Sequence, residues 1–253
     1  FPTGTVNDDG SDLWNAYAYR NSWKSVYNYP RCILTNVMVH EIGHNLGLGH
    51  SGYGTNAYGD RSCTMGASYV FQQGPKLCFN GAKSWQLGWY EEYHLDIDPS
   101  QKDGYSLQLV GLSNFDQLLN HYDNNNNDNN DNDYSIVVRL KSSTLWNQED
   151  EYYLVYNRRT GINSGVVMGG DTVMVTFSRA GSGRSTLLAM LQSFLSRVLF
   201  IPTNGNEVVV IQVRGFSTTS SFRYAKVVVT TCRTLWCRFV RQFESAIMDG
   251  FFT

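Results

Sequence analysis

The chain has 253 residues, of which 42% are hydrophobic, 14% aromatic and only 17% charged, and its formal net charge is −2. This length allows one large domain or two smaller ones, with enough apolar residues for a sizeable core. No basic stripe is visible, so nucleic acid is not an expected partner. No stretch can span a membrane, because the most apolar run, residues 187–201, is short and contains polar residues.

The first forty residues predict short, irregular structure. Residues 1–12 are rich in turn formers and are expected to form a loop. The alternation at residues 17–19 and the composition of residues 25–27 each predict a short strand. The aromatic side chains of this segment can line a substrate cleft or pack against the element that follows, and the sequence leaves both readings open. The chain begins at Phe1, as a processed product or a fragment would, so its compartment cannot be judged from a missing targeting signal.

A helix is expected from about Asn36 to Leu46. Thr35 and Asn36 offer N-cap chemistry, and Gly47 can adopt the left-handed conformation that commonly ends a helix. The side of this helix that faces the core is predicted from its apolar residues, which are Val37, Met38, Ile42 and Leu46.

The same helix carries the most informative pattern in the chain. Residues 40–50 read H-E-x-x-H-x-x-G-x-x-H, the extended zinc-binding signature of the metzincin proteases. His40 and His44 are four residues apart, so their imidazoles project to one side and can reach one metal ion. The turn at Gly47 lets His50 arrive as a third ligand. Three histidines and one water form the open site of a catalytic zinc, so one Zn²⁺ ion is expected.

Other residues near this motif have expected roles. Glu41 can reach the zinc-bound water and act as the general base, taking its proton during attack on the scissile carbonyl and passing it to the leaving amine. Met65 is the candidate for the methionine turn that metzincins carry beneath the metal. Tyr69 is a possible transition-state or fifth ligand, and an ordinary packed tyrosine is the alternative reading. Asn80 is expected to cap a short helix with Ala82, Trp85 and Trp89 on one face, ended by residues 88–90.

With these residues in place, the sequence resembles the gametolysin-like metalloproteases of algae and other eukaryotes, which are secreted zinc endopeptidases of the metzincin group. The resemblance covers residues 14–93 closely. The zinc signature is common to all metzincins, whereas the run from Lys83 to Tyr90 is specific to this family. The matching segments are residues 14–27, 39–52, 58–60, 65–66, 68–69 and 78–90.

The resemblance implies that His40, His44 and His50 are the zinc ligands, that Glu41 is the catalytic base and that Met65 forms the methionine turn. It also implies a secreted, extracellular protein that cleaves extracellular-matrix or cell-wall glycoproteins. Metzincins place a larger β-rich subdomain before the signature than this chain does. Most of that upper sheet is therefore expected to be missing.

The second half of the chain has a different sequence pattern. Short β-like runs separated by turn residues predict a β-sandwich or an open barrel. Residues 187–199 fit either an amphipathic helix or two buried strands. The run Asp123–Asp133 predicts a disordered insertion, with a Ca²⁺ site as the weaker alternative. The predicted strands are residues 105–110, 134–140, 152–157, 172–177, 207–213 and 224–231.

The number and spacing of the cysteines indicate whether the protein is secreted or intracellular. There are five, so at least one lacks a partner within the chain, and none belongs to a C-x-x-C pair. Beside the protease signature, we expect a secreted protein with one or two disulfides, and the alternative is an intracellular protein with five thiols. The cysteines are Cys32, Cys63, Cys78, Cys232 and Cys237.

These observations predict an α+β fold. An N-terminally truncated metzincin catalytic domain (residues 1–94), with a zinc helix and a methionine turn, is followed by a β-sandwich-like domain (95–231) and a tail of unknown role (232–253). The predicted function is that of a zinc-dependent endopeptidase. The alternative is a non-catalytic matrix- or glycan-binding fragment derived from such a protease. A structural zinc site is disfavoured because no fourth protein ligand is evident.

Overall fold

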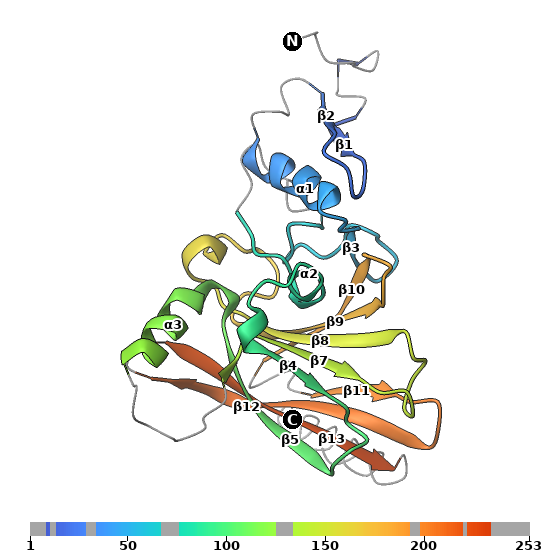
Figure 1. The fold of residues 1–253 in the computed structure, drawn as a ribbon, viewed down its shortest axis with the longest axis vertical. Helices are drawn as coiled ribbons and strands as arrows, with labels where there is room; N and C mark the ends of the chain where they lie inside the picture. The colour runs from blue at the N-terminus through green and yellow to red at the C-terminus, as the bar shows by residue number, and fades with distance from the viewer. Residues whose placement is uncertain are drawn as a thin grey trace, which may run out of the picture.

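The computed structural model describes residues 9–10, 14–28, 34–66, 76–124, 134–192, 198–219 and 222–233 (Figure 1). The protein is mostly β, with 42% strand and 17% helix arranged in three sheets and few helices. The predicted α+β metzincin class is therefore wrong. The error arose because the prediction gave most weight to one helix, whereas the β-branched and aromatic runs after residue 94 form most of the regular structure.

A two-stranded antiparallel sheet precedes the first helix. It pairs β1 (Ala16–Ala18) with β2 (Ser25–Tyr27), close to the two strands expected from the sequence. Hydrogen bonds hold this hairpin to the end of the helix: the backbone N–H of Asn21 donates to the carbonyl of His44 at 3.2 Å, and Ser25 Oγ donates to Asn45 Oδ1 at 2.6 Å. The hairpin and the helix therefore form one unit.

Helix α1 (Thr35–Asn45) has the predicted extent to within a residue. Gly47 ends it with φ +89°, as predicted. The predicted N-cap is wrong. Leu34 occupies that position without a side-chain hydrogen bond, and the buried Asn36 side chain has no hydrogen-bond partner in the described structure.

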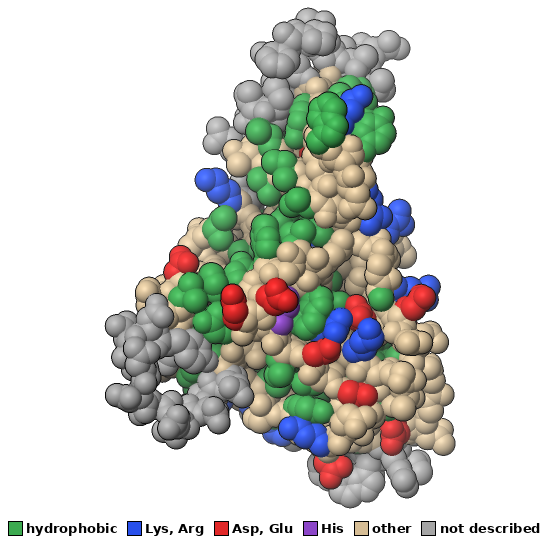
Figure 2. Space-filling model, viewed as in Figure 1, with side chains coloured by type: hydrophobic (Ala, Val, Ile, Leu, Met, Phe, Trp, Pro, Cys, Tyr) green, Lys and Arg blue, Asp and Glu red, His purple; other side chains and the backbone are tan. Residues whose placement is uncertain are grey.

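The buried face of α1 also differs from the prediction. Val37 is buried as expected, but Met38, Ile42 and Leu46 are exposed. The buried face carries the polar side chains of the histidine motif instead. Figure 2 shows hydrophobic side chains over the part of the molecule that contains α1 and the β1–β2 hairpin. The apolar periodicity was misleading because the motif, and not the apolar stripe, faces the rest of the molecule.

The largest sheet has six strands in the order β3-β10-β9-β8-β7-β4. The β3–β10 and β4–β7 pairs are parallel, and the other pairs are antiparallel. Its edge strands β3 and β4 both come from the first hundred residues, so the sheet joins the two halves of the chain. The domain limits proposed from the sequence stay predictions. The strands are β3 (Ser51–Tyr53), β4 (His94–Ile97), β7 (Val137–Lys141), β8 (Asp150–Asn157), β9 (Thr172–Arg179) and β10 (Ser185–Leu191).

The second large sheet has five strands in the order β11-β12-β13-β5-β6, all antiparallel except the β5–β6 pair. Residues 187–199, which the sequence left open, contribute to strands β10 and β11, and residues 193–197 lie outside the described residues. The strands are β5 (Gly104–Val110), β6 (Tyr134–Ser135), β11 (Val198–Pro202), β12 (Glu207–Thr218) and β13 (Arg223–Arg233).

The two large sheets pack face to face around the main core. Leu140 and Leu154 of the six-stranded sheet share this core with Leu109, Ile211 and Val227 of the other sheet, and all five are fully buried. Each such side chain contributes about 1.5–3 kcal/mol on burial. Alternation along β8 places its remaining side chains on the opposite face, where helix α2 lies.

Helix α2 (Gly81–Gln86) covers the outer face of the six-stranded sheet. Its Asn80 cap is confirmed, because the side chain accepts a hydrogen bond from the Lys83 N–H at 3.1 Å. Trp85 packs partly buried against the sheet, whereas Trp89 lies beyond the end of the helix and is exposed. The other helical elements are α3 (Phe115–Asn124) and the short 3-10 turns η2 (Glu91–Tyr93), η3 (Leu112–Asn114) and η4 (Gly161–Asn163).

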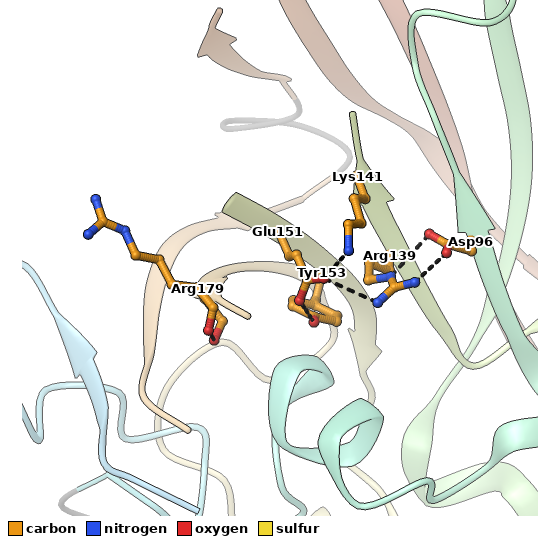
Figure 3. Close-up of polar contacts among 7 residues, drawn as sticks. Asp96, Arg139, Lys141, Glu151, Tyr153 and Arg179 are labelled. Atoms are coloured by element: carbon orange, nitrogen blue, oxygen red, sulfur yellow. Dashed lines mark hydrogen bonds and ion pairs between the residues drawn. The ribbon is translucent and has the colours of Figure 1, made fainter. Parts of the chain in front are cut away.

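A polar cluster links neighbouring strands of the six-stranded sheet (Figure 3). Arg139 on β7 pairs with Asp96 on β4 and, at 3.2 Å, with Glu151 on β8. Glu151 is buried and also accepts a 2.6 Å hydrogen bond from the Tyr153 hydroxyl. A buried carboxylate with several partners fixes the strand register, because a shift of one residue would leave its charge unpaired.

Some sequence predictions lie outside the described residues. These are Tyr69, most of the Asp123–Asp133 run with its possible Ca²⁺ site, and residues 234–253 of the tail. No helix in the described part of the chain is long and apolar enough to cross a membrane.

Candidate metal centre and substrate cleft

Three histidines converge at the C-terminal end of α1. His40 and His44 project from the helix, and the turn at Gly47 returns the chain so that His50 faces them. One ring nitrogen from each lies within 4.8 Å of the others, and the Nε2 atoms of His44 and His50 are 3.1 Å apart. Side chains 40, 44 and 50 are thus brought together as the sequence motif requires.

Two backbone carbonyls fix the orientation of the helical histidines. The Nδ1 atom of His40 lies 2.8 Å from the carbonyl oxygen of Thr64, and the Nδ1 atom of His44 lies 2.8 Å from that of Leu48. A carbonyl only accepts hydrogen bonds, so each Nδ1 carries the proton and the lone pair of each ring lies on Nε2. This is the usual outer-shell arrangement of metal-ligating histidines, and the donor set fits a metal ion.

Burial keeps the imidazoles in the form that binds a metal. Burial is the largest cause that lowers the pKa of His40, to about 4, and that of His50, to about 3, and the neighbouring histidines contribute to both shifts. Burial also lowers the pKa of His44. Because a metal binds the neutral imidazole, the three side chains are ready to bind at neutral pH without losing protons.

Glu41 lies beside the histidine cluster with an unusual environment. The side chain is only 5% exposed, and its Oε2 atom has no hydrogen-bond partner in the described structure. Burial raises its pKa to about 7. A buried carboxyl oxygen without a hydrogen-bond partner is costly, so the position of Glu41 indicates a role in the cleft rather than in stability.

Met65 packs directly beneath the helix that carries the histidines. It is fully buried with Leu48, Cys63 and Phe79. A Cβ atom at Gly43 would overlap the Met65 sulfur, so the glycine allows this close approach. The position agrees with the methionine-turn hypothesis, and the functional role of Met65 stays a prediction.

A buried lysine donates a hydrogen bond to the backbone of the third histidine. Lys83 on α2 is 1% exposed, and its Nζ donates to the carbonyl of Gly183 and, at 3.4 Å, to the carbonyl of His50. Burial lowers the pKa of Lys83 to about 8. The lysine therefore joins the histidine turn to the segment that precedes β10.

A second buried polar network supports the strand that follows His50. Asp60 is fully buried and accepts hydrogen bonds from Ser51 Oγ at 2.7 Å and from Asn80 Nδ2 at 3.1 Å. Ser51 Oγ also lies 3.0 Å from Ser185 Oγ on β10. Because every carboxylate oxygen of Asp60 has a partner, this network fixes β3, α2 and β10 relative to one another.

The histidines open into a cleft of about 450 Å³. Its walls come from β1, α1, the turn before β3 and the turn before β10. The described residues that line it are Asn15, Ala16, Tyr17, Ala18, Arg20, Val37, His40, Glu41, His44, Gly49, His50, Tyr58 and Arg184. Of the two readings of the N-terminal aromatic segment, the structure supports a cleft lining for Tyr17, whereas Trp23 is exposed.

Sequence reasoning missed three cleft residues. The Tyr58 ring packs against the His50 imidazole with centroids 3.9 Å apart, and burial raises the pKa of its hydroxyl. Arg20 and Arg184 bring positive charge to the cleft. The motif gave no signal for Arg184, because it is 134 residues away from His50 in the chain and only the β3–β10 pairing brings it close.

The cysteines are not part of this site. Cys63 and Cys78 are free thiols, and burial raises the pKa of each to about 12. Cys232 is disulfide-bonded. The described cysteines therefore supply no thiolate to the histidine cluster at neutral pH.

One of the comparisons with known proteins identifies a family. A family model described as gametolysin peptidase M11 matches residues 14–144, more than half of the chain. No curated protein and no solved structure matches the chain. The matched segment contains the histidine motif and Tyr58, whereas strand β10 and Arg184 lie outside it.

Proposed function

The chain belongs to the gametolysin peptidase M11 family, and we propose that it is a zinc-dependent endopeptidase with Glu41 as its catalytic base. The family is one of peptidases, so a metal and a protein substrate follow from membership. The assignment of zinc and of Glu41 as the base depends on one observation: three imidazole nitrogens converge beside the buried carboxyl group of Glu41, whose Oε2 has no hydrogen-bond partner among the described residues. We assign His40, His44 and His50 as the zinc ligands.

The metal, when bound, supplies Lewis acidity that polarises the scissile carbonyl and makes water more acidic. Glu41 takes the proton of the attacking water and returns it to the leaving nitrogen. Its pKa of about 7 suits both steps, because a group that titrates near neutral pH accepts and releases a proton with little cost. His40 and His44 keep their orientation through the carbonyls of Thr64 and Leu48.

The walls of the cleft favour an extended peptide. Strand β1 pairs with β2 along one edge, and its other edge has no strand partner among the described residues. Ala16 and Ala18 of this strand line the cleft. An unpaired edge can bind a substrate backbone by strand addition, which holds the scissile bond beside the histidines.

We also propose that the protein is secreted and acts on extracellular-matrix or cell-wall glycoproteins. Family membership supports a protein substrate. The disulfide at Cys232 supports an oxidising compartment, because disulfides persist outside the reducing cytosol.

Hydrolysis of a casein-type substrate by the zinc-loaded protein tests this function. We expect Glu41→Gln to lower the rate by roughly 10²–10⁴-fold, the usual contribution of a general base, while the zinc content stays unchanged. Glu92→Gln is the matched control, because Glu92 is exposed and remote from the cleft lining, and it should keep the full rate. A zinc-loaded protein that hydrolyses nothing would favour the alternative of a non-catalytic binding fragment.

A further inference from the structure

Arg184 reaches the cleft from the turn between β9 and β10. Its two chain neighbours are bonded to the histidine turn: the Gly183 carbonyl accepts from the Gly49 N–H at 2.7 Å, and the Ser185 N–H donates to the His50 carbonyl at 3.1 Å. The Arg184 carbonyl accepts from Ser178 Oγ at 2.6 Å. The backbone of Arg184 is therefore fixed relative to the proposed metal ligands.

The Arg184 side chain passes over the backbone next to His50. Its Cγ lies 2.9 Å from the place that a Cβ atom on Gly49 would occupy, so only glycine fits there without displacing it. The side chain lines the cleft together with His50 and Tyr58. The guanidinium is solvent-exposed and has no hydrogen bond or ion pair with any residue that the structure describes.

The two other cationic side chains near the histidines already donate hydrogen bonds to backbone carbonyls. Arg20 donates from Nε and Nη2 to the Gly47 carbonyl, at 3.2 and 2.8 Å. Lys83 donates to the carbonyls of Gly183 and His50. The only carboxylate that lines the cleft in the described structure is that of Glu41, which is buried against the helix.

A guanidinium beside a cation-binding triad is an unfavourable placement unless an anion comes between the charges. Arginine offers a planar fork of donors that matches a carboxylate in two parallel hydrogen bonds. A substrate carboxylate bound there would satisfy the exposed guanidinium and offset its repulsion from the metal.

We propose that Arg184 is a specificity-determining residue that selects peptide substrates with an aspartate or glutamate side chain next to the scissile bond. The inference rests on the proposed endopeptidase function and adds its substrate class. It also gives the second half of the chain a direct part in substrate recognition, because Arg184 belongs to the segment that leads into β10.

The test begins by locating the preferred position of the acidic residue. A mixture of denatured proteins is digested with the zinc-loaded protein, and the cleavage sites are identified by mass spectrometry. Two peptides are then made from the most frequent site, identical except for glutamate or glutamine at that position and blocked at both ends. A third peptide has glutamine and a free C-terminal carboxylate, which separates a side-chain carboxylate from a terminal one.

We expect the wild-type protein to hydrolyse the glutamate peptide with a kcat/KM on the order of tenfold or more above that of the glutamine peptide, since a hydrogen bond to a charged group is worth at least this factor. Most of the difference should be in KM. Arg184→Gln should abolish the preference. Arg184→Glu should reverse it, so that a fourth peptide, with lysine at the same position, is preferred. A ratio within one variant does not depend on how much of that variant is folded.

Arg179→Gln is the matched control. Arg179 lies at the end of β9, its side chain is 64% exposed, and it pairs with Asp150. Neither residue lines the cleft. The substitution removes the same charge from the same hairpin, and the glutamate preference should remain.

Binding separates this inference from the proposed function. Glu41→Gln is expected to bind substrate without turnover, so fluorescence anisotropy of the labelled peptides gives affinities that do not depend on the rate of hydrolysis. If no cleavage site is found, labelled peptides from casein that differ only in glutamate or glutamine take their place. Tighter binding of the glutamate peptide that is lost with Arg184→Gln supports the inference, whether or not the wild type is active. Equal rates or affinities for the two blocked peptides overturn it, and so does a preference that requires the free terminal carboxylate.

Discussion

At the scale of single residues, the histidine site is built by burial and by two carbonyls. Burial keeps His40 and His44 as neutral imidazoles, and hydrogen bonds from Nδ1 orient the rings so that the lone pair lies on Nε2. Without a metal, the same burial makes protonation of these imidazoles unfavourable, because the charged ring is desolvated. The metal-free protein should therefore be sensitive to acid.

The sign of this effect follows from the shifted pKa values. His40 and His50 have folded pKa values of about 4 and about 3, below the ordinary 6.5, so the stability linked to them is present above pH 6.5 and is lost as the pH falls towards those values. Glu41 acts in the opposite direction, because its folded pKa of about 7 lies above 4.5 and its contribution is lost as the pH rises from 4.5 through 7. The histidines outnumber it, so they determine the net direction.

We predict that the melting temperature of the metal-free protein falls between pH 8 and pH 5. The measurement is a series of thermal unfolding curves after chelation. Glu41→Gln removes the opposing contribution, so the fall should become steeper in this variant. A melting temperature that rises on acidification over this range would contradict the assignment of buried, neutral histidines.

At the scale of elements, α1 shows where sequence reasoning succeeded and where it failed. The extent of the helix and its end at Gly47 could be predicted, because both depend on local chemistry. The choice of buried face could not, because it depends on what the rest of the molecule places beneath the helix. Leu46 is 50% exposed, whereas Leu48, two residues further on, is fully buried.

This contrast gives a matched pair of substitutions. Leu48→Ala should lower the free energy of unfolding by about 2–5 kcal/mol, because it leaves a cavity in the small core beneath α1. Leu46→Ala should change it by no more than about 0.5 kcal/mol, as is usual at the surface. Urea unfolding measures both values. Equal losses would show that the outer face of α1 is buried in solution.

A second prediction at this scale concerns Lys83, through which α2 contacts the turn that carries His50. Lys83→Met keeps the length of the side chain but removes the donor to the His50 and Gly183 carbonyls. Metal affinity should fall by roughly 10–100-fold, as it does when outer-shell partners of a ligand are lost. Competition with a chromophoric chelator measures the affinity. Lys102→Met, at an exposed turn, serves as the control and should keep the wild-type value.

At the scale of the whole molecule, the histidine site depends on strands from the second half of the chain. Strand β3 begins directly after His50 and pairs in parallel with β10. The bonds of Gly49 and His50 to residues 183 and 185 also cross between the two halves. A fragment of residues 1–94 should therefore lose high-affinity metal binding, although it contains all three histidines. A fragment that binds zinc as tightly as the full chain, in the same chelator competition, would show that the first half is independent.

The same long-range pairing explains what could not be read from the sequence. The His40–His50 motif and the Asn80 cap are local patterns, and the structure places both as expected. The predicted α+β class was wrong because the number of paired strands, and which halves of the chain they join, follow from contacts far apart in sequence. Arg184 was missed for the same reason, since no local pattern links it to the histidines.

X-ray absorption spectroscopy of the zinc-loaded protein tests the central claim most directly. The account predicts one zinc ion per chain with three imidazole nitrogens in its first coordination shell and no sulfur, and it predicts the loss of this signal in His44→Ala. A spectrum with sulfur ligands, or a protein that holds no zinc after exposure to the ion, would contradict the assignment of His40, His44 and His50 as the metal site.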